Sequence, residues 1–560
     1  KDGCLYFLEK SDFFRDDYNR MMRFTMNQIG HRLVGRPHFF LIHFILIFAC
    51  ILLISSPVSA GEKKKETVSS SNELVFLSAS ELAEKIKSRQ VTSFEVVNAY
   101  FNHIEKHNHT LNAIVTLDKD AAIQRAKDAD AALGKGELWG ALHGVPITIK
   151  DNIATLGLKT TNSYPLTKNY VPDFDATVVA RLRKAGAIIL GKTNLPPLAM
   201  DFQTNSPLFG ITNNPWDISR TPGGSTGGGA AAVAAGLTSL EIGNDLAGSI
   251  RIPSHFCGVY GLKPTEYLVP LTGMSPGLPR KEYRSFRHQI HIGPIARSIN
   301  DLKLCLTIIA GPDGTDVDVP YIPLNEPRKK DLKDLHIAWT DDFGGVPVSE
   351  DTRIALKQFT EKLSKAGCKV VKINPTDFDF MSAWQTHGKI IDMELGILTP
   401  SFARFLQYIL LGSYRFGNPT MMMEYPISYE KYLTELTKRD TFISTMERFL
   451  SGYDVFLCPV HTTAAYKHIT PDRYFDVFPF HKKDFLVDNK PIKYYAANAS
   501  YTSIFDLTGN PVVVMPVGYT KEGLPIGIQV VGQRWHDMEL LNVSGQLDKI
   551  ANAYKHPPGF

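Results

Sequence analysis

The sequence predicts an α/β protein, and two observations carry that prediction. Segments with apolar residues at helical spacing alternate with short apolar runs that have the length of buried strands. The composition is that of an ordinary globular protein, with 44% hydrophobic and 21% charged residues among 560. A chain of this length and composition has ample apolar material for a large core.

The predicted elements of the first half begin after a polar linker, residues 61–76. The first helical pattern follows with Ser78 or Ser80 as its cap, and further helices are predicted over 93–106 and 120–133. Two short β-rich runs then predict strands, "VPITIKD" and "AIILGKTN", with the helix-like "ATVVARLRKAG" between them. Predicted helices and strands therefore alternate along this half of the chain, as they do in an α/β protein.

The second half predicts fewer elements. An amphipathic helix is expected over 351–367, and a long apolar helical region over 381–416 with a break at Pro400. The segment 510–533, "NPVVVMPVGYTKEGLPIGIQVVGQ", predicts two strands joined by a turn at "KEG". A final helix is predicted over 537–550.

An apolar run near the start, "HFFLIHFILIFACILLISSPVSA" (38–60), predicts a transmembrane anchor or a signal segment. Its apolar part has about the 20 residues needed to cross a bilayer. Arginines before the run favour a cytoplasmic start, so we expect a single-pass membrane protein whose catalytic domain is lumenal or extracytoplasmic. Cleavage would instead give a secreted protein. Residues 1–37 form a poorly defined segment, and 77–560 are expected to form one domain.

Charge and cysteine content argue against several partners. The formal net charge of +4 is too small to indicate a nucleic-acid partner. The six cysteines are scattered, without CxxC or zinc-like spacing, so neither a metal site nor a disulfide framework is indicated. We expect no metal and no organic cofactor. A homodimer is left open as an assembly.

The stretch "TPGGSTGGGAAAVAAGLTSLEIGNDLAGSIRIPS" (221–254) carries the candidate chemistry. It lacks the lysine of a phosphate-binding loop, and no strand precedes it as a dinucleotide fingerprint requires. "AAAVAAGL" is a strong helix former and "SLEIG" is a short strand, so the stretch predicts two glycine turns packed around them. In the second turn, backbone N–H groups of Leu246, Ala247 and Gly248 are candidates for an oxyanion hole. Ser249 is then a candidate nucleophile, which requires a base.

Several separated motifs resemble the amidase signature family. They are "GVPITIKDN", "TNNPWDISRTPGGS", "GGSTGGGAAAVAAGL", "EIGNDLAGSIRIPSHFCGVYGLKPT" and "GLPIGIQVVGQ", in the family's order and within residues 77–550. The resemblance implies a large mixed, twisted β-sheet surrounded by helices. Within the family, the N-terminal apolar run points to the fatty acid amide hydrolase 2 type.

The resemblance also implies a mechanism. The protein is expected to cleave the C–N bond of carboxylic amides through a Ser-Ser-Lys triad and an acyl-enzyme. Ser249 would be the nucleophile, Ser225 the bridging hydroxyl after a cis peptide bond, and Lys150 the base, which burial makes neutral. Asp245 and Arg251 would brace the nucleophile turn.

Three positions depart from the family pattern. Ala247 stands where the family usually has glycine, Asn244 where it has threonine, and Thr226 where serine is common. None of these departures removes a member of the implied triad. The methyl group of Ala247 is the one expected to crowd a substrate carbonyl.

The expected substrate is a fatty-acid amide. An apolar segment supports this expectation with candidate acyl-channel residues, which are Phe402, Phe405, Leu406, Ile409 and Leu410. Three alternatives stay open: a hydrolase of small or xenobiotic amides and esters, an amidotransferase subunit, and an inactive membrane-anchored scaffold.

Overall fold

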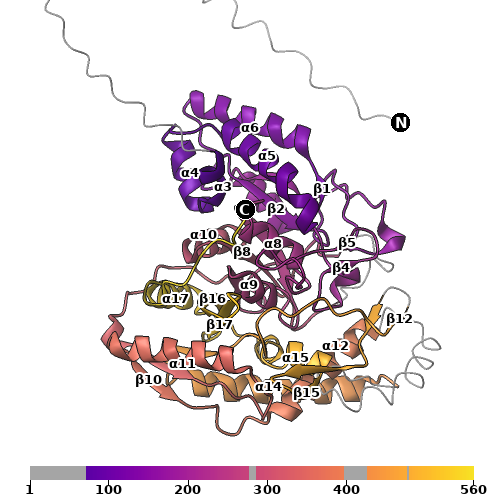
Figure 1. Cartoon of the computed structure of the whole chain (residues 1–560), viewed down its shortest axis with the longest axis vertical. Coiled ribbons are helices and arrows are strands. Elements are labelled where there is room, and N and C mark those ends of the chain that lie inside the picture. Colours follow the sequence, from indigo (N-terminus) through magenta and orange to yellow (C-terminus); the bar gives the residue numbers. More distant parts are fainter. Residues whose placement is uncertain (1–70, 276–285, 397–425, 476–477) are drawn as a thin grey trace, which may run out of the picture. The chain divides into compact units, whose positions relative to one another are not determined.

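A large mixed β-sheet organises the structure, a computed structural model that describes residues 71–275, 286–396, 426–475 and 478–560 (Figure 1). These ranges lie within one compact unit, residues 69–560. The 11-stranded sheet has the order β1 (Ile114–Leu117), β3 (Ile188–Thr193), β2 (Pro146–Lys150), β6 (Leu240–Asp245), β8 (His291–Ala296), β7 (Tyr260–Lys263), β16 (Val512–Tyr519), β17 (Pro525–Val531), β11 (Val455–Pro459), β9 (His336–Trp339) and β10 (Lys369–Lys372). The predicted α/β class with a large mixed sheet is confirmed.

Two parallel groups of strands lie in this sheet, separated by antiparallel strands. β3, β2 and β6 are parallel neighbours, as are β10, β9 and β11. Within the first group, Lys150 is opposite Thr193, and Thr148 is opposite Glu241. Because β2 and β6 run in the same direction, their carboxyl ends meet at one edge of the sheet, where ligands bind in open α/β sheets.

Helices surround the sheet (Figure 1). Those of eight or more residues are α4 (Ala79–Lys87), α5 (Ser93–Leu111), α6 (Lys119–Gly134), α7 (Thr177–Lys184), α8 (Gly227–Ala234), α10 (Ile299–Ile309), α11 (Glu350–Lys365), α12 (Phe380–Gly396), α14 (Tyr429–Leu450) and α17 (Asp537–Ala551). Shorter helices are α3 (Ser71–Phe76), α9 (Arg251–Cys257), α15 (Tyr494–Ala499) and α16 (Ser503–Leu507). The described residues also form three two-stranded sheets: β4 (Asn205–Ser206) with β5 (Gly210–Ile211), β12 (Arg473–Phe475) with β13 (Phe478–Phe480), and β14 (Asp484–Val487) with β15 (Lys490–Lys493).

Local sequence explains where several of these elements begin and end. Ser78 forms a complete capping box with Glu81, which settles the cap of α4 in favour of Ser78. α5 has a second capping box, at Thr92 with Glu95, and ends on Asn112 in the left-handed conformation. The turn predicted at "KEG" joins β16 to β17, which pair antiparallel.

The main core lies on both faces of the sheet. Every residue of β2, β3 and β6 is buried, as expected for strands that helices cover on both sides. A second apolar cluster includes Phe343, Trp384 and Phe456 and packs beneath α12 and α14. The strands that end near Lys150 and Asp245 are therefore held rigidly.

The expected membrane location is corrected by the structure. No helix within the described ranges is long and apolar enough to cross a bilayer, which contradicts the prediction of a single-pass membrane protein. That prediction came from residues 38–60 alone, which lie outside the described residues, and apolar length is only one requirement for a spanning segment. The helix predicted over 381–416 is described as α12 as far as Gly396. Its break at Pro400 and the five acyl-channel candidates (402–410) also lie outside the described residues.

Candidate active site

Lys150 and Ser225 meet at the carboxyl edge of the first parallel group. Lys150 is the last residue of β2, and Ser225 lies in the glycine turn before α8. The Lys150 Nζ donates hydrogen bonds to Ser225 Oγ at 2.7 Å and to Thr226 Oγ1 at 2.9 Å. The peptide bond between Gly224 and Ser225 is cis, as the resemblance implied. Two predicted site residues are thus in direct contact.

The surroundings of Lys150 favour its neutral form. All of its side chain is buried, and no carboxylate of a described residue lies within ion-pair distance. Burial lowers the pKa of Lys150 to about 7, although the charges of Glu241 and Asp245 oppose that shift. An amine with this pKa is about half neutral at pH 7, so it can accept a proton from the serine that it contacts.

Ser249 lies in the turn between β6 and α9, beside a small cavity. The cavity has a volume of about 140 Å³, and Ser249, Leu246 and Ala247 border it. Its other walls are mainly apolar and include Met200, Phe202, Ile391 and Leu395. A carbonyl group in this cavity would meet both the Ser249 hydroxyl and the backbone of the turn.

The two glycine turns contact each other through the backbone. Thr226 N donates to the Ser249 carbonyl oxygen at 3.1 Å. Among the described residues, the hydroxyl groups of Ser225 and Ser249 form no hydrogen bond with each other. The proton relay expected from the triad needs that contact, and such contacts often tighten only when substrate is bound.

The nucleophile turn is built around the Asp245 carboxylate. This group accepts the N–H of Gly248 at 2.7 Å and that of Ile250 at 3.0 Å. Gly248 has a φ of +112°, and a Cβ there would lie 2.6 Å from Thr502 Oγ1, so the turn requires glycine. Gly248 was expected to supply an oxyanion-hole N–H, but that N–H is already donated to the Asp245 carboxylate. Within the described ranges, the N–H groups of Leu246 and Ala247 have no such acceptor.

Arg251 fixes Asp245 from beneath, as expected for a bracing pair. Its guanidinium donates to both Asp245 oxygens, at 2.8 and 3.0 Å, and to Asp506 at 2.5 Å. All three side chains are fully buried. Burial alone would raise the pKa of Asp245, but Arg251 and the backbone N–H donors hold that pKa below its usual range. The carboxylate that shapes the turn therefore stays ionised.

Sequence reasoning missed several residues of this site. Asp506, Thr502 and Gln529 contact Arg251 from the C-terminal part of the chain, and no local pattern relates them to it. His387 lines the cavity beside Ser249, and burial lowers its pKa to about 3, so it is neutral. A signal did exist for Glu241, which is the one charged residue between the apolar residues of "SLEIG".

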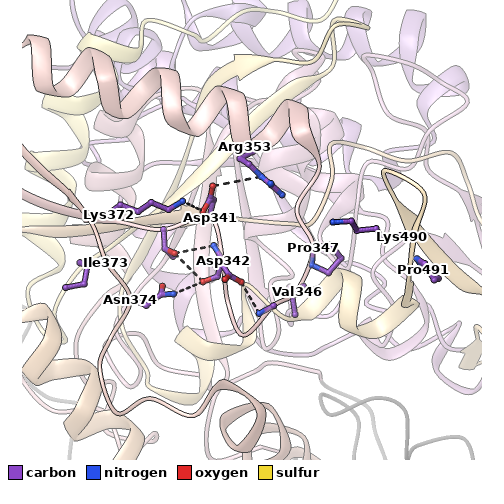
Figure 2. Close-up of a pocket in the computed structure, with 12 residues that line it drawn as sticks. Asp341, Asp342, Val346, Pro347, Arg353, Lys372, Ile373, Asn374, Lys490 and Pro491 are labelled. Carbon is purple, nitrogen blue, oxygen red and sulfur yellow. Dashed lines mark hydrogen bonds and ion pairs between the residues drawn. The ribbon is translucent and has the colours of Figure 1, made fainter.

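A second, larger cavity lies apart from these residues (Figure 2). It measures about 920 Å³ and lies at the carboxyl ends of β9 and β10. Asp341 forms ion pairs with Lys372 at 2.6 Å and with Arg353 at 4.0 Å, and Figure 2 marks both with dashed lines. None of the predicted site residues lines it. In the part of the chain that the structure describes, no three His, Cys, Asp or Glu side chains gather as metal ligands would.

The chain is similar to known proteins over most of its length. A family model described as Amidase matches residues 95–541. The A subunit of the glutamyl-tRNA(Gln) amidotransferase of Thermoanaerobacter pseudethanolicus is 32% identical over 516 residues, with 87% of this chain and 98% of the relative covered. Its counterpart of the same name in Prochlorococcus marinus is 32% identical over 500 residues, with 86% and 99% covered.

Solved structures share the fold. A fatty acid amide hydrolase superposes with a TM-score of 0.70 at 22% identity, covering 96% of this chain and 94% of that one. A bacterial aryl acylamidase gives 0.69 at 22% identity, covering 87% and 99%. The fatty acid amide hydrolase is thus one similar structure among several. The comparisons do not favour the fatty acid amide hydrolase type over other members of the family. The family matches establish that this chain belongs to the amidase family of enzymes, which act on amide C–N bonds.

Proposed function

We propose that the protein is a serine amidase in which Ser249 attacks the amide carbonyl, Ser225 relays the proton and Lys150 is the base. The observation that carries this proposal is the contact of the Lys150 Nζ with Ser225 Oγ at 2.7 Å in a fully buried site. A lysine in water would be protonated at pH 7 and unable to act as a base. Here, burial lowers its pKa to about 7.

The reaction proceeds through an acyl-enzyme. Neutral Lys150 takes the proton of Ser225, which takes the proton of Ser249 as the Ser249 oxygen bonds to the carbonyl carbon. Backbone N–H groups of Leu246 and Ala247 stabilise the resulting oxyanion. The proton then returns through Ser225 to the leaving nitrogen, the C–N bond breaks, and water hydrolyses the ester by the same route. Asp245 and Arg251 support the turn without touching the substrate.

The cavity beside Ser249 supports an apolar acyl group. An apolar cavity of about 150 Å³ holds a molecule of the size of benzene, and this one measures about 140 Å³. A short aliphatic or aromatic acyl group fits that volume directly. A fatty-acid amide, the longer alternative, would have to extend past it. Small or xenobiotic amides and esters with a compact acyl group are therefore the substrates that the described cavity favours.

A second candidate function is that of an amidotransferase subunit. The observation in its favour is the 32% identity to proteins of that name over 87% of this chain. The mainly apolar cavity walls favour the first function over this one. We further propose that residues 77–560 form a single amidase domain, and a homodimer is an assembly that mass photometry would test.

A fluorophosphonate probe tests the nucleophile. We expect covalent labelling of Ser249, mapped by mass spectrometry, and its loss in Ser249→Ala. Ser254→Ala is a matched control, because this buried serine lies in α9 and its hydroxyl donates to the Ile250 carbonyl at 2.8 Å. Folded protein that carries no label on Ser249 would refute the assignment and favour an inactive scaffold.

Substrate preference is tested with a series of amides. Acetamide, butyramide, benzamide, palmitamide, an N-acyl ethanolamine and glutamine cover the alternatives. We expect the highest kcat/KM for butyramide or benzamide. Preference for palmitamide would select the lipid substrate, and hydrolysis of glutamine alone would select the amidotransferase function.

A further inference from the structure

Glu241 is a buried carboxyl group close to the proposed base. It lies on β6, is fully inaccessible to solvent, and accepts the Thr148 hydroxyl at 2.5 Å and the Thr193 hydroxyl at 2.6 Å. Thr148 and Thr193 belong to β2 and β3, the two strands beside β6 in the parallel group. A buried carboxyl group with only hydroxyl donors needs a reason to be there, because burial of a charge without compensation is costly.

The register of the strands places this carboxyl group near Lys150. Thr148 is opposite Glu241, and Thr193 is opposite Lys150. Thr148 and Lys150 are two residues apart on β2, so their side chains point to the same face about 7 Å apart. Thr148, which donates to Glu241, is therefore the neighbour of Lys150 on the same face of β2.

The charged groups around this pair come from three strands. Lys150 interacts electrostatically with Glu241 and Asp245, both on β6, and Glu241 interacts in the same way with Lys150 on β2 and Lys192 on β3. The Lys192 ammonium itself donates to Thr155 at 2.9 Å and interacts with Asp151. α8 covers this face and contains only glycine, alanine and valine, so it adds no charge.

α8 is also shaped to leave room for Glu241. A Cβ on Gly229 would lie 2.4 Å from Glu241 Cγ, so any other residue at 229 would displace the carboxyl group. The sequence of the helix and the position of the carboxyl group are therefore mutually dependent.

We propose that Glu241 is a positioning residue of the reaction, held by Thr148 and Thr193 so that its carboxylate sets the proton affinity of Lys150. This inference rests on the proposed function, in which Lys150 is the base. As Lys150 takes the proton of Ser225, the ammonium that forms is stabilised by the carboxylate across the strand. Burial raises the pKa of Glu241 to about 7, so its charge changes in the same pH range as that of Lys150.

The sign of the effect follows from the charges. A carboxylate stabilises an ammonium, so loss of the Glu241 charge lowers the pKa of Lys150. An opposite charge near a buried ionisable group can shift the pKa of that group by about one unit or more. In Glu241→Gln we expect the pH at which Lys150 becomes neutral to fall by about one unit.

The experiment measures the rate of fluorophosphonate labelling of Ser249 from acid to alkaline pH. Wild-type labelling should rise through pH 7 or nearby, and the Glu241→Gln curve should rise at a lower pH with a lower plateau, because a weaker base is formed. Glu241→Asp should restore the position of the curve in part. Asp537→Asn is the matched control, since Asp537 is a buried carboxyl group that accepts the Thr265 hydroxyl at 2.6 Å and does not interact with Lys150.

The outcomes separate the two proposals. Wild-type protein that is never labelled on Ser249 would defeat the proposed function. Labelled wild type with an unmoved curve in Glu241→Gln, or the same shift in Asp537→Asn, would overturn the role of Glu241 alone. If Glu241→Gln does not fold, Thr193→Val removes one hydroxyl donor and should give a smaller shift in the same direction. An unmoved curve in that variant would equally overturn the inference.

Discussion

Replacement of Arg251 by methionine is expected to lower the free energy of unfolding by about 3–5 kcal/mol at pH 7. The guanidinium is fully buried and donates to Asp245, Asp506, the Thr502 carbonyl and the Gln529 side chain. Methionine fills much of the same volume but supplies no donor. The ionised Asp245 carboxylate then stays buried without its counter-charge and Asp506 loses its donor, which is the costly case. A loss of this size is a large part of the stability of a typical protein, about 5–15 kcal/mol.

Lys493→Met provides the matched control. Lys493 pairs with Asp484 at 2.6 Å, much the same distance as in the Arg251 pairs, but the two side chains are 50% and 43% exposed. Such an exposed pair contributes about 0–1 kcal/mol. The nitrogen–oxygen distance is thus similar in the ion pairs that the two variants remove, while the burial of the side chains differs.

Urea unfolding followed by pulse proteolysis measures both variants. Acid provides a further check, because Asp245 has a lowered pKa in the folded wild type. Its contribution to stability is present above its unfolded pKa, about 3.9, and is lost as the pH falls through the folded value. Without Arg251, the pKa of Asp245 rises, so acid neutralises its buried charge in the folded variant. The difference in the free energy of unfolding between wild type and Arg251→Met should therefore become smaller from pH 7 to pH 4. Equal losses in Arg251→Met and Lys493→Met would refute the argument that burial makes this ion pair essential.

Three further predictions concern activity. Lys150→Met should lower the labelling rate of Ser249 by about 10²–10⁴-fold while leaving the fold intact by circular dichroism, because the general base is lost; near-normal labelling would exclude Lys150 as the base. Gly248→Ala should be nearly inactive in amide hydrolysis, since its Cβ would clash with Thr502 Oγ1 at 2.6 Å. Gly523→Ala is the control, because Gly523 also has a positive φ but a Cβ there meets no atom within 4 Å, so that variant carries backbone strain without a clash. Ala247→Val should lower kcat/KM for benzamide more than for acetamide, because Ala247 borders the 140 Å³ cavity; equal losses for both amides would show that the cavity does not hold the acyl group.

Local patterns predicted the elements of the fold well where a physical signal was strong. A cap at Ser78 or Ser80, the strand that ends on Lys150 and the two strands joined at "KEG" all follow from propensity and periodicity, and the structure selects Ser78. The contact of Lys150 with Ser225 was predicted from the resemblance to a family, since periodicity cannot relate positions that far apart.

Other features required the three-dimensional structure. Asp506 contacts Arg251 across 255 positions of sequence, and a buried Asp in "IFDL" looks like any polar residue of a short helix. The donation of the Gly248 N–H to Asp245 depends on a turn geometry that residue types alone do not specify. The membrane prediction failed because it was made from one apolar run, and hydropathy reports composition without context.

The order of strands in the sheet has a consequence for synthesis on the ribosome. β16 and β17, made last among the strands, lie between β7 and β11 in the middle of the sheet. The partners of Arg251 emerge 251, 255 and 278 positions after it. At about 5–20 residues per second, the nascent Arg251 waits roughly ten seconds to a minute for them. A polypeptide released before Thr502 would contain Lys150, Ser225 and Ser249 yet lack the three late partners that hold Arg251 beneath the nucleophile turn. Hydrolytic activity should therefore arise only when translation is almost finished.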